Sequence, residues 1–374
     1  MPAKNKGIAF RNVVKYIIFA TNIIAIALLF CSPLAWHVSP LKTNFFSYIG
    51  LAFGFIFYIN LLYFFFWLLF SKWRLALVSL IAMVICFKPV TTFFPLHPFP
   101  KKAPATAVKI LTYNVEGFRN ENRKGQSEHP LLEYIAKTDA DIVCLQEYMV
   151  SKTGQSIISQ KEVNRILKAY PYRSVTGLES SGMYHIYGLA CFSKFPIKKT
   201  QEIAFDSSYN GAAIYSILIG DSVYTVANVH LESNRIMAED KKLYSDFLQN
   251  KESADLDAVA TNIRARMGRG FRKRAEQVKE VRKYIDRQNA AGTIICGDFN
   301  DTPISYAYSH MKGNLKDAYV SNGFGPGITY HEDLFLFRID YIFHSQNIQS
   351  YQTTVGKIKY SDHYPVYTYL NIPR

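Results

Sequence analysis

The segment Ile294-Ile295-Cys296-Gly297-Asp298-Phe299-Asn300 is an apolar run that ends on polar side chains. Four further segments share this pattern, the last of them in two parts: residues 110–114 (ILTYN), 142–147 (IVCLQE), 226–230 (VANVH), and 338–340 (RID) followed by 361–363 (SDH). Apolar runs of this length, rich in Val and Ile, are typical of strands buried on both faces. Because side chains reach solvent at the ends of such strands, we expect functional groups to gather there.

The composition of the 374-residue chain changes near residue 100. Residues 1–100 contain no Asp or Glu and hold all three tryptophans, which is not the composition of a water-soluble domain. They also carry eight basic residues, so the formal net charge of +14 leaves the rest of the chain only modestly basic. That charge is compatible with an anionic substrate or a membrane surface and requires neither.

Apolar segments in residues 1–90 predict a membrane anchor with about three transmembrane helices, at about residues 14–35, 45–70 and 73–94. The third is marginal, because its uninterrupted apolar core covers only residues 75–87. The basic residues place the N-terminus in the cytoplasm, so three spans predict an extracytoplasmic C-terminal domain, and loss of the third span would reverse this. A cleaved signal peptide is the alternative for the first segment, although no small-residue cleavage site follows it.

The segment 88–107 contains too many prolines for a helix or a central strand, and we expect a stiff linker that holds the following domain off the membrane. From residue 108 onward, strand-like runs alternate with helical patterns at residues 131–137, 162–169 and 274–287. This alternation is typical of an α/β domain with a large buried sheet. We expect that domain to occupy residues 108–374.

In this order and spacing, the segments that end on Asn114, Glu147, His230, Asn300 and His363 resemble motifs of the endonuclease/exonuclease/phosphatase superfamily. The superfamily includes deoxyribonucleases, abasic-site nucleases, sphingomyelinases and inositol-polyphosphate phosphatases. Each motif alone is a weak signal, whereas the full series in register is specific. The resemblance implies a four-layered α/β sandwich, in which two packed mixed sheets are flanked by helices.

The resemblance implies a metal site at Glu147, in the motif LQE, together with Asn114 and Asp362. A hard divalent cation prefers carboxylate and amide oxygens, and the five cysteines form no cluster in the sequence. We therefore expect Mg²⁺ as the cofactor, with Mn²⁺ as an alternative, rather than Zn²⁺.

The catalytic residues implied by the resemblance are His230, Asp298, Asn300, Asp340 and His363. Asp298 would orient or deprotonate the attacking water, and Asn300 would bind the phosphate or that Asp. His230 would contact the phosphate. His363 would stabilise the transition state or protonate the leaving group, with Asp340 as its carboxylate partner.

Weaker candidates for substrate binding are Arg119, Tyr184 and Arg274, each of which, as an isolated residue, is more typical of a surface group. The charged region 234–274 has two interpretations. It is either a solvated pair of helices or a basic lid near His230 that contacts phosphate, with Gly268 and Gly270 giving the lid freedom to move.

Together these features predict a membrane-anchored, divalent-metal-dependent phosphoesterase, in particular a phosphodiesterase that attacks phosphorus with water in line. The substrate would be nucleic acid, phospholipid or sphingolipid, and the sequence shows no feature that requires a protein partner. The alternative is a membrane receptor or scaffold whose hydrolase-like domain only binds a phosphorylated ligand.

Overall fold

The computed structural model of the chain describes residues 2–99, 101–118, 129–153, 157–234, 256–332 and 336–373. It has two compact units, Met1–Phe93 with Ile304–Tyr306, and Phe94–Pro303 with Ala307–Arg374. The change of composition near residue 100 therefore lies close to the boundary between the two units.

The first unit is helical. Its elements are α1 (Pro2–Cys31), η1 (Ser32–Trp36), α2 (Phe45–Leu51), α3 (Phe53–Leu69), α4 (Trp73–Ile85) and α5 (Phe87–Phe93). One helical stretch, Val13–Trp36, is long and apolar enough to cross a membrane. The pairs α2–α3 and α4–α5 pass the same test only as pairs, and they bend by 60° and 74°. The described residues thus offer one span, or up to three if each bent pair forms a single span.

The predicted helices at about residues 45–70 and 73–94 are each broken in the structure, at Ala52 and at Cys86. The second break has a clear cause, because Pro89 has no N–H to donate to the carbonyl of Ile85 and α4 cannot continue through it. Pro89 is tolerated in the first turn of α5, where backbone N–H groups have no acceptor within the helix.

Buried polar side chains join three helices of this unit. Trp67 Nε1 on α3 donates to Asn22 Oδ1 on α1 at 3.0 Å, and Asn22 Nδ2 donates to Ser79 Oγ on α4 at 3.1 Å. All three residues are buried. Interhelical hydrogen bonds of this kind stabilise helix packing in an apolar environment.

The predicted linker 88–107 differs from the structure at residues 88–93, which are helical in α5. The rest of it that the structure describes, residues 94–99 and 101–107, contains no helix or strand, but it is not a free spacer. His97 N donates to Gly323 O at 3.0 Å, and Gly325 N donates to Pro95 O at 2.9 Å. Pro95 and His97 are therefore part of the second unit rather than of a free linker.

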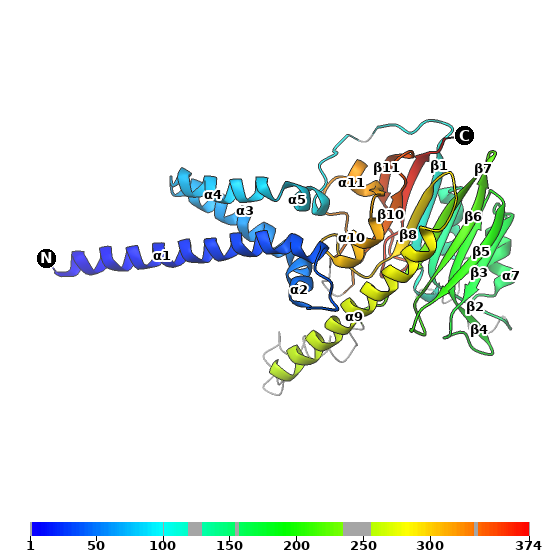
Figure 1. Cartoon of the computed structure of the whole chain (residues 1–374), viewed down its shortest axis with the longest axis horizontal. Coiled ribbons are helices and arrows are strands. Elements are labelled where there is room, and N and C mark those ends of the chain that lie inside the picture. The colour runs from blue at the N-terminus through cyan, green and yellow to red at the C-terminus, as the bar shows by residue number, and fades with distance from the viewer. Residues whose placement is uncertain are drawn as a thin grey trace. The chain divides into compact units, whose positions relative to one another are not determined.

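The second unit contains two six-stranded sheets (Figure 1). The first has the order β11-β12-β1-β2-β4-β3 and consists of β1 (Val108–Asn114), β2 (Ile142–Ser151), β3 (Tyr172–Gly177), β4 (His185–Ser193), β11 (Gln349–Val355) and β12 (Val366–Asn371). The second has the order β5-β6-β7-β8-β10-β9 and consists of β5 (Ile197–Ala204), β6 (Gly211–Ile219), β7 (Ser222–His230), β8 (Thr293–Asp298), β9 (Lys316–Asp317) and β10 (Asp340–His344). The pairs β1–β2 and β7–β8 are parallel and the other pairs are antiparallel, so both sheets are mixed.

A buried apolar layer lies between the two sheets. It includes Ile110 and Cys144 from the first sheet and Val226 and Cys296 from the second. Neighbouring residues on the same strands belong to the two outer clusters, as expected from the two-residue period of a strand. The apolar runs of the sequence are thus strands that are covered on both faces.

Helices cover the outer faces. The described helices of this unit are η2 (Glu116–Phe118), α6 (Pro130–Thr138), α7 (Gln160–Ile166), α9 (Leu256–Ile285, yellow in Figure 1), α10 (Tyr306–Lys312) and α11 (Ala318–Asn322). Leu131 of α6 and Val163 of α7 pack on the first sheet, and Val278 of α9 and Met311 of α10 pack on the second. The predicted four-layered α/β sandwich is confirmed.

Candidate functional site

Strand pairing aligns three of the predicted catalytic residues at one end of the second sheet. His230 ends β7, Asp298 ends β8 and Asp340 begins β10. In the pairing register, His230 lies opposite Asp298 and Asp298 lies opposite Asp340. In the first sheet Asn114 ends β1 beside β2, and its side chain reaches Asp298 in the second sheet. The site therefore lies where the ends of both sheets meet.

Gly297 makes the approach of β7 and β8 possible just before Asp298. Its φ is +139°, and a Cβ at this position would lie 1.9 Å from the carbonyl oxygen of Val229. No other residue type fits without moving the backbone of β7. This explains why glycine precedes Asp298 in the motif.

Asp298 is the most connected carboxylate of the site and is only 1% exposed. It accepts hydrogen bonds from Asn300 N at 2.8 Å, Asn300 Nδ2 at 3.2 Å and Asn114 Nδ2 at 3.1 Å. Burial raises the pKa of Asp298 to about 6, against the opposing effect of His363. A carboxylate with this pKa accepts a proton near neutral pH, as a general base must.

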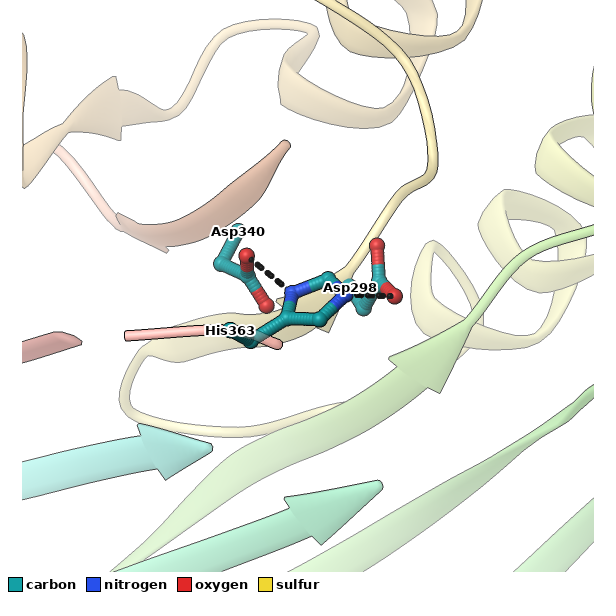
Figure 2. Close-up of side chains that lie close together, drawn as sticks. All are labelled: Asp298, Asp340 and His363. Atoms are coloured by element: carbon teal, nitrogen blue, oxygen red, sulfur yellow. Dashed lines mark hydrogen bonds and ion pairs between the residues drawn. The ribbon is translucent and has the colours of Figure 1, made fainter. Parts of the chain in front are cut away.

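His363 lies between two carboxylates (Figure 2). Its Nδ1 is 2.8 Å from Asp340 Oδ2, and its Nε2 is 3.6 Å from Asp298 Oδ2. Burial alone would lower the pKa of His363, but the charges of Asp340 and Asp298 and the hydrogen bond to Asp340 raise it well above 6.5. The ring is therefore an imidazolium with Nε2 directed at Asp298.

Asp298, Asp340 and His363 also place three potential ligand atoms within 4.8 Å of one another, which is close enough to hold a metal ion. However, Nδ1 of His363 is engaged by Asp340, and a positively charged ring is a poor metal ligand. In the geometry described, the cluster is therefore better suited to holding a proton than to holding a metal ion.

His230 is 3% exposed and faces both halves of the site. Its Nε2 lies 3.7 Å from Glu147 Oε1 and 3.7 Å from Asp298 Oδ2. Asn114 bridges the same two carboxylates, because its Nδ2 also donates to Glu147 Oε1 at 3.0 Å. The predicted metal ligand Glu147 and the predicted base Asp298 are thus connected through a shared amide.

A cluster of carboxylates forms the other half of the site. It includes the predicted ligands Glu147 and Asp362 and also Glu116, which sequence analysis missed although it lies two residues beyond Asn114. Burial and the neighbouring charges of Asp362 and Glu147 raise the pKa of Glu116 to about 7. Burial also raises the pKa of Asp362, with Glu147 adding to it and His363 opposing it. Such carboxylates would be stabilised by a bound cation.

Three residues of the site have left-handed backbone conformations, with φ of +46° at Glu116, +50° at Glu147 and +51° at Asn300. Residues other than glycine rarely adopt this region, and it costs free energy that the surrounding structure must supply. At Glu147 the cause is a β-bulge, because the pairing of β2 with β4 shifts register between Leu145 and Tyr148.

Asn228, on the opposite sheet, supports this bulge. Its Nδ2 donates to Leu145 O at 3.0 Å and to Ala190 O at 3.2 Å, the two carbonyls where the β2–β4 ladder is interrupted. Its Oδ1 accepts from Gln146 Nε2 at 2.6 Å. Asn228 and Gln146 are fully buried, so this bridge crosses the layer between the sheets directly beneath Glu147. Sequence analysis assigned no role to either residue.

The three weaker candidates have different outcomes. Arg119 lies outside the described residues. Tyr184 is 66% exposed, and its side chain is not among the buried groups of the site. Arg274 is fully buried, so its side chain is not accessible from solvent. The prediction that it contacts substrate is therefore corrected.

Arg274 instead joins two loops that follow catalytic residues. Its Nε donates to Asp301 Oδ2 at 3.0 Å, one residue beyond Asn300. Its Nη1 donates to Glu232 O at 2.8 Å and to Asn234 Oδ1 at 3.0 Å, in the loop that begins after His230. The guanidinium is a buried clasp between the loops that continue from β7 and β8.

The basic region is a single helix where the structure describes it, since residues 256–274 belong to α9, and residues 235–255 lie outside the described residues. Gly268 and Gly270 lie inside this helix and do not form a hinge. A Cβ at Gly270 would lie 3.1 Å from Asn234 Oδ1, so this glycine lets α9 pack closely against the loop after His230.

Comparison with known proteins agrees with this site. The sequence model of the Endonuclease/Exonuclease/phosphatase family matches residues 111–363, and the model of a domain of unknown function matches residues 15–93. No curated protein matches the chain.

Solved structures are similar to about 71% of this chain. An endonuclease/exonuclease/phosphatase from Beutenbergia cavernae DSM 12333 is 16% identical and has a TM-score of 0.50, over 71% of this chain and 72% of that one. A family protein from Leptotrichia buccalis C-1013-b is 19% identical, with a TM-score of 0.49, over 71% of this chain and 100% of that one. The human Nocturnin catalytic domain with bound sulfate is 16% identical, with a TM-score of 0.49, over 71% of this chain and 95% of that one.

The family match covers more than half of the chain and contains every residue of the site, from Asn114 to His363. The fold agrees with it. The chain therefore belongs to the Endonuclease/Exonuclease/phosphatase family and is a hydrolase that acts on phosphoester bonds.

Proposed function

We propose that the protein is a membrane-anchored, divalent-metal-dependent phosphodiesterase. The observation that carries this proposal is the position of Asp298, which lies within 3.7 Å of both His230 and His363 and is joined to Glu147 through Asn114. This arrangement supplies a base, two imidazole groups and an adjoining set of carboxylates.

The carboxylate cluster fits a hard divalent cation. Glu147, Asp362 and Asn114 would hold it, with Glu116 as a further ligand, and all four offer oxygen. The raised pKa values of Glu116 and Asp362 are those expected of carboxylates that lack a neutralising charge. When bound there, Mg²⁺ or Mn²⁺ would neutralise the non-bridging oxygens of the phosphate.

The remaining groups have roles that follow from their positions. Asp298 accepts a proton from the attacking water, with Asn300 fixing its carboxylate through two hydrogen bonds. The His363 imidazolium, held by Asp340, stabilises the charge that develops on the phosphoryl oxygens. His230 donates to the phosphate from the neighbouring strand. These steps describe in-line displacement by water without a covalent enzyme intermediate.

The anchor is assigned to the first unit. Val13–Trp36 supplies one span, and the hydrogen bonds among Asn22, Trp67 and Ser79 favour packing of α1, α3 and α4 as a bundle in the membrane. We propose three spans with a bend in the second and third, and an extracytoplasmic catalytic unit. A reporter fused to the C-terminus tests this topology, and a cytoplasmic C-terminus would contradict it.

The decisive experiment is hydrolysis by the full chain in detergent, on panels of DNA, RNA, phospholipid, sphingolipid and inositol phosphate, with Mg²⁺ or with EDTA. Cleavage of a diester that requires metal supports the proposal. A folded protein that binds a phosphorylated ligand but cleaves none of the panels would favour the alternative of a receptor or scaffold.

Metal addition should stabilise the protein in a pH-dependent way. Because the folded pKa of Glu116 is raised to about 7, its protonation favours the folded state, and this contribution is lost as pH rises through about 7. Mg²⁺ takes the place of that proton. We expect a fixed Mg²⁺ concentration that is 100 times the Kd at pH 8 to add about 2.7 kcal/mol of stability at that pH, and clearly less at pH 5.5, where protonation of Glu116 weakens Mg²⁺ binding. Melting curves with and without Mg²⁺ measure this, and an equal shift at both pH values would contradict it. In the variant Glu116→Gln, the stabilisation by Mg²⁺ should depend less on pH.

Replacing Asn228 should weaken metal binding at a distance. Asn228→Leu removes the donors to Leu145 O and Ala190 O and frees the bulge that directs Glu147. We expect about 10- to 100-fold weaker Mn²⁺ binding, the usual effect of losing a partner that positions a ligand. Calorimetric titration measures it. The control is Thr225→Val on the same strand, which is also buried. Equal Mn²⁺ affinity in both variants would refute the role of Asn228.

A further inference from the structure

The pair formed by Asp340 and His363 joins two separate segments of the chain (Figure 2). The two residues lie 23 positions apart in the sequence. Asp340 begins β10, whereas His363 lies in the loop before β12. The hydrogen bond between their side chains, 2.8 Å long, therefore depends on how the backbones of these two segments are held relative to one another.

A short stretch of backbone, Thr329-Tyr330, lies between the two segments. Tyr330 forms one antiparallel bridge with Phe337, three residues before Asp340, and another with His363. Thr329 N donates to Phe337 O at 2.8 Å, and Thr329 O accepts from Tyr364 N at 2.6 Å. The same two residues are thus bonded to the backbone that leads into β10 and to the backbone that carries His363.

The side chain of Thr329 adds a direct hold on Asp340. Its Oγ1 accepts a hydrogen bond from Ile339 N at 3.0 Å and another from Asp340 N at 3.1 Å. A hydroxyl oxygen has two lone pairs, so one side chain satisfies both backbone groups at the start of β10. Thr329 is fully buried, and bulk water does not reach these two N–H groups if the hydroxyl is removed.

We propose that Thr329 is a positioning residue for the hydrolytic reaction, whose hydroxyl fixes the backbone from which Asp340 holds His363. It acts through Asp340 rather than on the substrate, because its side chain is closed off from solvent. A displacement of about 1 Å near a reacting group can lower turnover about 100-fold. This inference rests on the role that the proposed function gives to Asp340 and His363, and it adds the residue that holds them in register.

The test compares two substitutions in the full chain in detergent. Thr329→Val keeps the shape of the side chain and removes the hydroxyl, whereas Thr329→Ser keeps the hydroxyl. The control, Thr368→Val, removes another fully buried hydroxyl, which donates to Tyr351 O within the first sheet. Hydrolysis of bis(4-nitrophenyl) phosphate with Mg²⁺ gives kcat and KM for each variant.

We expect Thr329→Val to lower kcat by about 10- to 100-fold with little change in KM. Thr329→Ser and Thr368→Val should have turnover close to that of the wild-type protein. If Thr329→Val does not fold, Thr329→Ala takes its place with the same expected results, because the smaller side chain leaves room for a water molecule at the two N–H groups. A Thr329→Ser variant as slow as Thr329→Val would overturn the inference.

A double-mutant cycle separates positioning from a general loss of packing. If Thr329 acts through Asp340, then Thr329→Val should lower kcat by a much smaller factor in a protein that already carries Asp340→Asn. A residue that only supports the fold would lower kcat by the same factor in both backgrounds, and that result would contradict the proposed role.

Proton NMR of the full chain with labelled histidine tests the inference without turnover. The Nδ1–H of His363 donates to Asp340 and should give a far-downfield resonance that is absent from Asp340→Asn. We expect Thr329→Val to shift or lose this resonance and Thr368→Val to keep it. Absence of turnover in the wild-type protein would count against the proposed function and leave this comparison to decide the inference. An unchanged resonance in Thr329→Val would then overturn it.

Discussion

Asp298→Asn should lower kcat by about 10²- to 10⁴-fold, the usual contribution of a positioned general base. The amide is nearly the same size as the carboxylate, but it cannot accept the proton of the attacking water. It also removes the negative charge opposite the His363 imidazolium, whose Nε2 lies 3.6 Å from Asp298 Oδ2. The loss should therefore fall on kcat more than on KM.

The pH profile gives a second readout of the same variant. With a folded pKa of about 6, Asp298 is protonated and inactive as a base at lower pH. We expect kcat/KM of the wild-type protein to fall about tenfold for each pH unit below about 6, and we expect this acidic limb to be absent from Asp298→Asn.

The matched control is Asp317→Asn. Asp317 is 4% exposed and accepts from Tyr308 Oη and Tyr319 N, away from the site, and its amide can still accept the hydrogen bond from Tyr319 N. Its turnover should be close to that of the wild-type protein. Unchanged turnover in Asp298→Asn, with melting temperatures equal to the wild type, would refute the assigned role of Asp298.

Arg274→Met should destabilise the catalytic unit by about 3 to 5 kcal/mol, because it removes the guanidinium from the buried carboxylate of Asp301. Asp301 is 5% exposed, so water cannot replace the guanidinium without a rearrangement. The loops after His230 and Asn300 lose their common anchor, and we expect kcat to fall with the stability. Denaturant unfolding followed by far-ultraviolet circular dichroism measures the loss of stability. Turnover measured on the same variant gives the loss of kcat.

Two further variants distinguish the clasp from an ordinary ion pair. Arg282→Met breaks an ion pair with Asp286, the residue that follows α9 and whose side chain is 56% exposed, and should cost less than about 1 kcal/mol. Adding Asp301→Asn to Arg274→Met removes the buried negative charge that the guanidinium faced and should restore part of the stability. If Arg274→Met lowers the free energy of unfolding by no more than Arg282→Met does, the proposed role of Arg274 in joining the two loops is wrong.

Much of the site could be predicted from the sequence because its residues occupy the ends of strands. Asn114, His230 and Asp298 each end an apolar run, and the runs are long enough to be recognised as buried strands without tertiary information. Parallel pairing of β1 with β2 and of β7 with β8 then brings the ends of neighbouring strands to one edge. The α/β fold class follows from the same alternation of patterns.

The helical breaks in the first unit were harder to predict. A continuous apolar segment looks the same whether the helix is straight or bent, and the 60° bend at Ala52 has no proline to mark it. Pro89 is visible in the sequence and, with the prolines that follow it, predicts a linker, whereas in the structure it lies in the first turn of α5. Local composition indicates that a helix stops, and packing decides whether another begins.

The sequence by itself determined the class of fold, the apolar first unit and the candidate site residues, because strand patterns, polar strand ends and hydropathy are local properties of the chain. Only the tertiary structure decided the roles of Glu116, Asn228 and Arg274. Each of these acts through contacts with residues distant in the chain, such as the bond from Asn228 to Leu145, 83 residues away. The residues next to a buried amide or guanidinium in the sequence do not indicate its hydrogen-bond partners. Those partners depend on how one sheet, loop or helix packs against another.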